Sequence, residues 1–518
     1  MPVLESLISI NNKLGQKEAA AGLLEWGKNN LQVDFKVRER WYEKLNEWDK
    51  ALEAYKKKEN EAVAAAVRKS GGKGGAAAAV DQDVLLGQMR CLEALGEWSQ
   101  LHAVSREHWD RVGPDTRGRM ARMASAAAWG KQEWGSMLQA VSLLQRDSQD
   151  GAFYRAVLAV HKQDYETAHA LIDLTRDMLD TELTALSAES YQRAYPIMIQ
   201  VQMLCELEEV VEYKLDPDRR ETIRAMWWSR LQGCQRVVED WQRILQVRSL
   251  VLAPADHERT WLKYASLCRK SNRLQLAHRA LVTILGTDPS ANLEQPLPTV
   301  LPQATFAYCK YLWGSGRKSV AYSQLGDFVK QYLHPRSVAL AGAASPPDEE
   351  AERQLVETRK LLARCYLKLG SWQESLEGLQ ESSIPTILNY YAAATEYDSG
   401  WYKAWHCWAV NNFETVLFYK MSSTSSAAGS SSSGSGGLSP AHISTYAVPA
   451  LQGFVRSISL SAGSSLQDTL RLLTLWFDYG HHSEMYEALN EGLRTIDINT
   501  WLQETENLMY ILMIFEWL

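Results

Sequence analysis

The chain has 518 residues, a net charge of −7 and 46% hydrophobic residues. This apolar content excludes a wholly disordered chain, and the mild acidity gives no reason to expect nucleic acid as a partner. No apolar run reaches the ~18–20 residues that a membrane-spanning helix needs. The seven cysteines lie far apart and form no C-x-x-C pair, so we expect neither a disulfide framework nor a zinc site.

Taken in chain order, the predicted elements are helices. Apolar residues recur at steps of three and four, as in Trp41, Leu45, Trp48 and Leu52. We expect helical repeats in four stretches, residues 1–57, 81–334, 351–420 and 441–503. Three predicted linkers, rich in Ala, Gly, Pro or Ser, separate them at residues 58–80, 335–350 and 421–440. Such compositions bury too little apolar surface to offset chain entropy, and we expect the last of these linkers to be disordered.

A short motif recurs between predicted helices, consisting of a tight polar turn, an aromatic residue and a small residue three positions later. Its copies read KLNEWDKA around Trp48, ALGEWSQL around Trp98, GKQEWGSM around Trp134, KQDYETA around Tyr165, KSNRLQLA around Leu274 and KLGSWQES around Trp372, with a weaker copy, GSGRKSVA, at Lys318. The early aromatics are 50, 36 and 31 residues apart, and the natural unit is near the ~34 residues of a tetratricopeptide-like helical hairpin.

The turn chemistry of this motif predicts helical hairpins. Gly96 and Gly370 suit the left-handed position that ends a helix, and Ser371 with Glu374 forms a capping box that starts the next one. We expect each turn aromatic to wedge between the two helices of its hairpin, rather than to form a ligand cage. The predicted fold class is therefore all-α, an α-solenoid of stacked hairpins.

The sequence contains no recognisable catalytic constellation. The glycine-rich run at residues 71–75 follows no strand and lies in a linker, so it is not a phosphate-binding loop. Kinase loops, H-E-x-x-H and G-x-S-x-G are absent. We expect His481 and His482 to be a turn pair whose side chains point apart, and carboxylates such as Glu208 and Glu209 to lie on solvated helix faces. We predict no catalytic residues and no metal site.

Several long phrases in this chain resemble the FAT domain of the target of rapamycin (TOR) kinases, which belong to the phosphatidylinositol-3-kinase-related kinases. The similarity extends from about Val3 to Gln503. The phrases are LESLISINNKL, MRCLEALGEW, DGAFYRAVLA, RLQGCQRVVEDWQ, TWLKYASLC, WYKAWHCWAV, VPALQGFVRSISLS and LQDTLRLLTLWFDYG. The divergent apolar segment 504–518 does not resemble the family, and we interpret it as the result of a truncated gene model, read-through of an intron or a shortened isoform.

The resemblance implies a C-shaped solenoid of tetratricopeptide-like and HEAT-like repeats that clamps the kinase domain of its parent. The parent is then a serine/threonine kinase, whose ATP and Mg²⁺ would bind only in the kinase domain, and the chain by itself is not an enzyme. Implied partners are that kinase domain and TOR-complex subunits of the Raptor, Rictor and DEPTOR types. The implied location is cytoplasmic, with peripheral association at lysosomal or endomembrane surfaces and a nuclear pool.

Basic residues recur at fixed distances before the turn positions. Lys270 lies four residues before the turn position Leu274, and Lys368 lies four residues before Trp372. Lys310 lies eight residues before Lys318, and Arg364 lies eight residues before Trp372. Stacked hairpins place such positions on one face, where cations need acidic partners, solvent or a polyanion. The spacing alone does not distinguish an anion-binding site from an ordinary solvated helix face, because Arg40 and Lys44 show the same spacing before Trp48.

The resemblance makes the basic face a predicted pocket for inositol hexakisphosphate. The matching cations are Lys263, Lys270, Lys310, Arg364, Lys368 and Lys403. The position after Trp313, where the family has a further lysine, is Gly314 here. We expect a structural ligand that rigidifies the solenoid. An alternative to the regulatory segment is a free-standing helical-repeat adaptor, made from a truncated transcript, that binds TOR-complex proteins.

Overall fold

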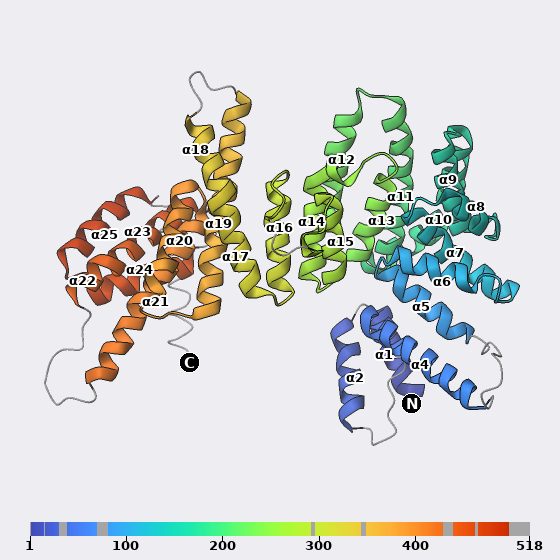
Figure 1. Cartoon of the computed structure of the whole chain (residues 1–518), viewed down its shortest axis with the longest axis horizontal. Helices are drawn as coiled ribbons and strands as arrows, with labels where there is room; N and C mark the ends of the chain where they lie inside the picture. Colours follow the sequence, from blue (N-terminus) through green and yellow to red (C-terminus); the bar gives the residue numbers. More distant parts are fainter. Residues whose placement is uncertain are drawn as a thin grey trace. The chain divides into compact units, whose positions relative to one another are not determined.

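The structure is a computed structural model that describes residues 2–14, 16–30, 39–69, 81–291, 296–342, 349–427, 439–461 and 465–496. Every regular element in these ranges is a helix (Figure 1), which confirms the predicted fold class. The chain divides into two compact units, Met1–Ile284 and Leu285–Leu518. The predicted tail 504–518 and most of the predicted linker 421–440 lie outside the described residues.

The first unit consists of helices that follow one another in antiparallel pairs. Its helices are α1 (Pro2–Lys13), α2 (Lys17–Asn30), α3 (Glu39–Lys44), α4 (Trp48–Lys69), α5 (Gln82–Ala94), α6 (Trp98–His108), α7 (Pro114–Gly130), α8 (Trp134–Ser142), α9 (Gln149–Lys162), α10 (Tyr165–Glu189), α11 (Tyr191–Leu215), α12 (Arg220–Gly233), α13 (Val238–Arg248), η1 (Pro254–His257), α14 (Glu258–Lys270) and α15 (Leu274–Leu285).

The second unit is also built from helices. Its helices are η2 (Pro289–Ala291), α16 (Pro302–Gly314), α17 (Lys318–Phe328), η3 (Val329–Leu333), α18 (His334–Gly342), α19 (Glu349–Glu377), α20 (Ile384–Tyr397), α21 (Tyr402–Ala427), α22 (Pro440–His442), η4 (Ile443–Ala447), α23 (Val448–Leu460), α24 (Leu466–Tyr479) and α25 (Ser483–Thr495). Its C-terminal core includes the buried side chains of Phe454, Leu472 and Met485.

Several helices extend into ranges that composition assigns to linkers. α4 continues to Lys69, inside the predicted linker 58–80, and α18 occupies part of the predicted linker 335–350, in which α19 also begins. α21 continues to Ala427, inside the predicted linker 421–440 that we expected to be disordered. The segments of α4 and α18 are rich in alanine, the residue with the highest helix propensity. A composition poor in core-forming residues therefore does not by itself mark the end of a helix here.

The recurring motif marks the hairpin turns. At six of its seven copies a new helix begins at the motif's central residue, which is Trp48, Trp98, Trp134, Tyr165, Leu274 or Lys318. The residue two positions earlier is left-handed in each turn, with φ between 58° and 88°, at Asn46, Gly96, Gln132, Gln163, Asn272 and Gly316. The residue that follows the left-handed one donates its backbone N–H to the carbonyl of the residue five positions earlier, as Glu97 does to Leu92 at 2.9 Å. This bond satisfies a carbonyl that the ending helix leaves open.

The seventh copy, around Trp372, does not form a turn, so this prediction was wrong. α19 continues without interruption from Glu349 to Glu377, and Gly370 lies inside it. A Cβ on Gly370 would lie 3.0 Å from the Tyr391 ring of α20, so the absent side chain allows the two helices to approach closely. The predicted capping box of Ser371 and Glu374 is likewise part of a continuous helix.

The turn aromatics also pack differently from the expected wedge within their own hairpin. Trp98 and Trp134 are only half-buried. The Trp98 ring lies against Gly130 at the end of α7, where a Cβ would come within 2.7 Å of it. The Trp134 ring stacks on His161 at the end of α9, with centroids 3.8 Å apart. At these two copies the turn tryptophan therefore fastens its hairpin to the following hairpin.

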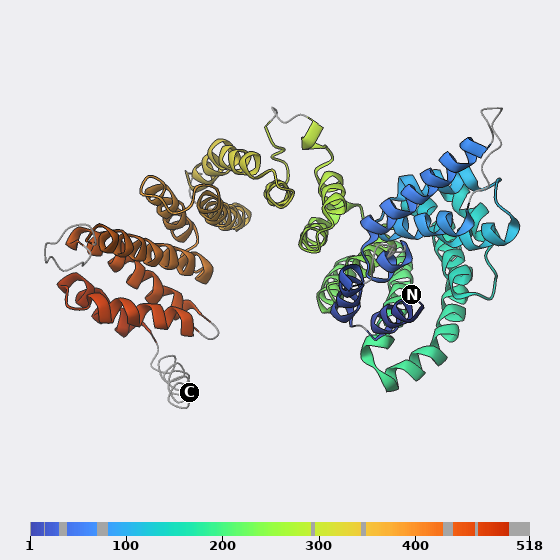
Figure 2. The same cartoon turned by 90° about the horizontal axis from the view of Figure 1, so that it is seen from below.

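The first unit curves until its early turns contact its last helices. Figure 2 shows α5 to α13 following one another along this curve. Trp48 Nε1 donates to Glu239 on α13 at 3.2 Å. Arg279 on α15 donates to the carbonyls of Gly96 and Leu95, at 2.7 and 2.9 Å. These contacts between segments far apart in sequence close the helical path around an internal space.

Candidate functional site

The six cations predicted to bind a polyphosphate fall into both units. Lys263 and Lys270 lie on α14 of the first unit, and both are exposed. They are seven residues apart, which places them on the same side of the helix. The other four belong to the second unit, Lys310 on α16, Arg364 and Lys368 on α19, and Lys403 on α21. That all six form a single site stays a prediction.

In the second unit, Lys310 and Arg364 flank a pair of buried thiols. Lys310 directly follows Cys309, and Arg364 directly precedes Cys365. Both cysteines are fully buried. Burial raises the pKa of Cys365 well above its usual range, and the neighbouring Cys309 adds to that increase. The positive charges of Lys310 and Arg364 both act in the opposite direction on the same thiol. The structure therefore brings these two cations, 54 positions apart in sequence, to one place.

Lys368 and Lys403 meet in the same way around Cys407 on α21. Burial raises the pKa of the Cys407 thiol, while the charges of Lys403 and Lys368 lower it. Arg364 and Lys368 are four residues apart on α19 and so share a face. Four of the predicted cations thus lie along a path across α16, α19 and α21 within one unit, in the order Lys310, Arg364, Lys368 and Lys403.

The aromatic residues beside these cations hold the helices in register. Trp313 near the end of α16 stacks on Trp372 of α19, with ring centroids 4.6 Å apart and planes within 2° of parallel. Gly314, the residue after Trp313, is exposed next to this stack. Lys310 Nζ lies 4.2 Å from the centroid of the Phe306 ring. The stack fixes α16 against α19 and so sets the separation of Lys310 from Arg364.

The environment of these cations is compatible with an external anion. In the ranges that the structure describes, no carboxylate lies within 4.0 Å of the charged groups of Lys263, Lys270, Arg364 or Lys403. Several arginines of the first unit are instead paired with carboxylates, as Arg122 is with Glu93 at 2.6 Å. Exposed cations repel one another and are relieved by solvent or by a bound polyanion.

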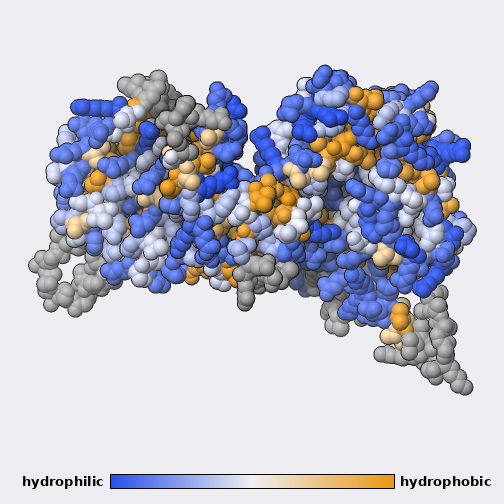
Figure 3. Space-filling model, turned by 45° about the horizontal axis from the view of Figure 1, so that its top comes forward, coloured by the Kyte–Doolittle hydropathy of each residue, from blue (hydrophilic) through white to orange (hydrophobic). Residues whose placement is uncertain are grey.

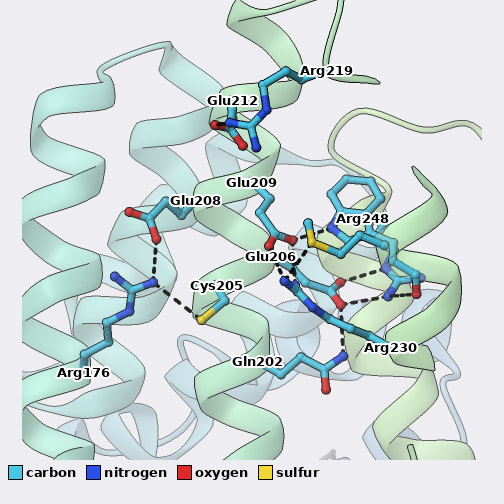
Figure 4. Close-up of polar contacts among 12 residues, drawn as sticks. Arg176, Gln202, Cys205, Glu206, Glu208, Glu209, Glu212, Arg219, Arg230 and Arg248 are labelled. Atoms are coloured by element: carbon cyan, nitrogen blue, oxygen red, sulfur yellow. Dashed lines mark hydrogen bonds and ion pairs between the residues drawn. The ribbon is translucent and has the colours of Figure 1, made fainter. Parts of the chain in front are cut away.

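The acidic segment of α11 differs from the solvated face that we expected (Figure 4). Glu206 is fully buried and receives two hydrogen bonds from Arg248 on α13, at 2.7 and 2.8 Å. Glu209 accepts from the Trp227 indole at 2.6 Å and pairs with Arg230 of α12. The expectation of a solvated carboxylate is therefore wrong for Glu209, whose side chain is 14% exposed, whereas the Glu208 side chain is 43% exposed.

This charged network can be recognised only in the tertiary structure. Its partners are separated by up to 42 positions in sequence, so no local pattern marks Glu206 as buried. Removing one partner of a buried ion pair typically costs about 3–5 kcal/mol, because the other charge remains in the interior. The network joins α11 to α12 and α13, and we assign it a structural function.

His481 and His482 lie in the turn between α24 and α25, as predicted, but their rings do not point apart. The ring centroids are 4.2 Å apart, because the residues occupy a turn and not a helix. Over the described ranges, no three His, Cys, Asp or Glu side chains are grouped so that they could hold a metal ion. No described helix is long and apolar enough to span a bilayer. On the face drawn in Figure 3, hydrophobic residues gather in several patches surrounded by hydrophilic ones.

Comparisons with known proteins agree with this architecture. A model of the FAT domain family matches residues 121–474. The chain is 50% identical over 507 residues to the serine/threonine-protein kinase mTor of Drosophila melanogaster, covering 97% of this chain and 19% of that protein. It is 38% identical over 506 residues to the serine/threonine-protein kinase tor1 of Schizosaccharomyces pombe, covering 96% of this chain and 20% of that protein.

A more distant similarity links the chain to another kinase. It is 23% identical over 401 residues to the serine/threonine-protein kinase ATR of Arabidopsis thaliana, covering 68% of this chain and 14% of that protein. The chain spans about a fifth of the length of the TOR-type curated relatives that it matches. The matched family is a helical-repeat domain and not a kinase domain.

Proposed function

Because the chain belongs to the FAT domain family, we propose that it is a non-catalytic regulatory and scaffolding segment of a TOR serine/threonine kinase. In this role its helices clamp the kinase domain of the parent chain. The parent transfers phosphate from ATP to serine or threonine hydroxyl groups in TOR signalling, which controls growth in response to nutrients. The identity with TOR-type kinases, which covers nearly the whole chain, supports this assignment.

We further propose that the basic face binds inositol hexakisphosphate as a structural ligand. The observation that carries this proposal is the path of Lys310, Arg364, Lys368 and Lys403 across three helices of one unit. A ligand with many phosphate groups forms charge-assisted hydrogen bonds to several cations at once. It would thereby join α16, α19 and α21 and stabilise the folded state by mass action. Lys263 and Lys270 of α14 belong to the first unit, and the proposal here concerns the four cations of the second unit.

The ligand proposal is tested by thermal unfolding of the whole chain. We expect inositol hexakisphosphate to raise the midpoint by several degrees, and the rise to shrink with salt because exposed charges are screened. Arg364→Glu with Lys403→Glu should abolish the rise. Arg359→Glu on the same helix is the matched control, since Arg359 is exposed and outside the set. An equal rise in both variants, or no rise in the unmodified chain, would refute the site.

The clamp is tested separately, by mixing the purified chain with the kinase domain of its parent. We expect a stable complex in sedimentation and a change in phosphotransfer by that domain. The alternative, a free-standing adaptor, predicts binding to Raptor-type or Rictor-type subunits without affinity for the kinase domain. The location at cytoplasmic, lysosomal and nuclear sites remains part of the proposal, and imaging of the tagged parent protein tests it.

A further inference from the structure

The first unit encloses a cavity that the proposed function does not use. The curved path of α4 to α13 surrounds an internal space of about 350 Å³, which lies in the size range of pockets for small molecules. The inner helices α5, α7, α9, α11 and α13 each contribute side chains to its wall. The contacts of Trp48 with Glu239 and of Arg279 with Gly96 close this path.

One side of the wall is aromatic and apolar. Trp129 packs against Phe153 and Tyr154, with ring centroids 6.0 and 6.4 Å apart. Leu179 and Met203 complete this side of the wall. Such a surface would bury an apolar side chain at about 25 cal/mol per Å² of area removed from water.

The indole of Trp129 carries a donor without a partner. Its side chain is only 4% exposed, yet its Nε1 has no hydrogen-bond partner, and the residue lines the cavity. Buried donors are almost always satisfied, because an unpaired one costs about 1–3 kcal/mol. This N–H group is almost inaccessible to a water molecule, so an acceptor in the cavity reaches it only when the indole turns toward that space.

The charged residues of the wall leave one group of each sign without an ion pair. Arg122 pairs with Glu93, and Glu239 with Arg273. Asp150 and Arg243 also line the cavity; both residues are exposed to solvent, and neither has an ion pair within 4.0 Å among the described residues. They are close enough to interact, since burial raises the pKa of Asp150 while Arg122 and Arg243 lower it. A ligand with one positive and one negative group would match this arrangement.

We propose that this cavity binds a free α-amino acid with a large apolar side chain. The carboxylate accepts from Trp129 Nε1 and pairs with Arg243, and the ammonium group pairs with Asp150. The apolar side chain lies against Phe153 and Leu179. A single ligand then supplies the missing acceptor, both missing charges and an occupant for the aromatic wall. The proposal is independent of the polyphosphate site, because every residue in it belongs to the first unit.

Calorimetric titration of the whole chain with L-phenylalanine, N-acetyl-L-phenylalanine and L-phenylalaninamide tests this proposal. The first compound carries both charges, the second lacks the ammonium group, and the third lacks the carboxylate. We expect L-phenylalanine to bind and the other two to bind at least tenfold more weakly. A chain that binds none of the three, or all three equally, overturns the proposal.

Two variants assign the charges to residues. Arg243→Gln should weaken L-phenylalanine at least tenfold and leave the amide unaffected. Asp150→Asn should weaken L-phenylalanine and leave the N-acetyl compound unaffected. The controls Arg236→Gln and Asp147→Asn alter exposed residues outside the wall and should bind as the unmodified chain does. Binding that survives both wall substitutions would show that the ligand lies elsewhere.

Discussion

Two segments that share the pattern Leu-Gly-x-Trp, one in each unit, adopt different structures. ALGEWSQL around Trp98 forms a turn, and α6 begins at its tryptophan, whereas KLGSWQES around Trp372 lies inside α19. Gly96 is left-handed, with φ of 65°, while Gly370 is helical and lies against Tyr391. The residue three positions after the tryptophan is fully buried at Leu101 and exposed at Ser375. Glycine at the same position of the pattern therefore has two functions. Gly96 allows the left-handed backbone of a turn, and Gly370 allows close packing of two helices.

Proline substitution should separate the two segments most strongly. Ser371→Pro removes a hydrogen bond inside α19 and introduces a clash with the preceding turn, so we expect a loss of about 3 kcal/mol or more. Lys318→Pro places proline at the first residue of α17, where the N–H has no partner within the helix, and should cost far less. Urea unfolding followed by circular dichroism measures both changes. Equally small losses would mean that α19 is broken at Gly370.

Alanine at the two glycines should give a smaller difference. Gly96→Ala forces a side chain into the left-handed region, at about 1–2 kcal/mol. Gly370→Ala gains up to about 1 kcal/mol of helix propensity, which the close contact with Tyr391 offsets, so we expect little net change. Hydrogen exchange in α5 and α6, compared with α19, measures the two effects locally. Similar losses at both sites would contradict the different functions that we assign to these glycines.

The smallest expected effect concerns acid. Burial lowers the pKa of His257 to about 4, and the nearby Arg248 and Arg224 contribute to that shift. Since the ordinary value is about 6.5, protons bind the unfolded state more tightly. The stabilising contribution is therefore complete above about pH 6.5 and is lost as the pH falls toward 4.

We expect His257→Gln to reduce the loss of stability between pH 7.5 and 5 by about 1 kcal/mol, allowing for the partial exposure of the ring. The change should appear in hydrogen exchange of the first unit, around α14, and leave α19 unaffected. An unchanged pH profile in the variant would assign the acid sensitivity to other groups.

Much of the helical architecture could be predicted from sequence because its signals are local. Apolar spacing identified helices, and the motif located six hairpin turns to the residue. In four of those turns the left-handed residue is Asn or Gln. There the sequence predicted a polar turn but not which residue would be left-handed. The candidate cations were selected by resemblance, and their grouping around Cys365 and Cys407 needed the tertiary structure.

The sequence by itself determined the helical fold class, the positions of most turns and the membership in the FAT family. Each of these depends on residues within a few positions of one another, or on similarity along the whole chain. Only the tertiary structure decided that Gly370 packs inside a helix, that Glu206 is buried with Arg248, and that Trp129 and Arg243 face one cavity. These outcomes depend on partners many residues away, because side-chain burial and charge pairing are set by which helices meet.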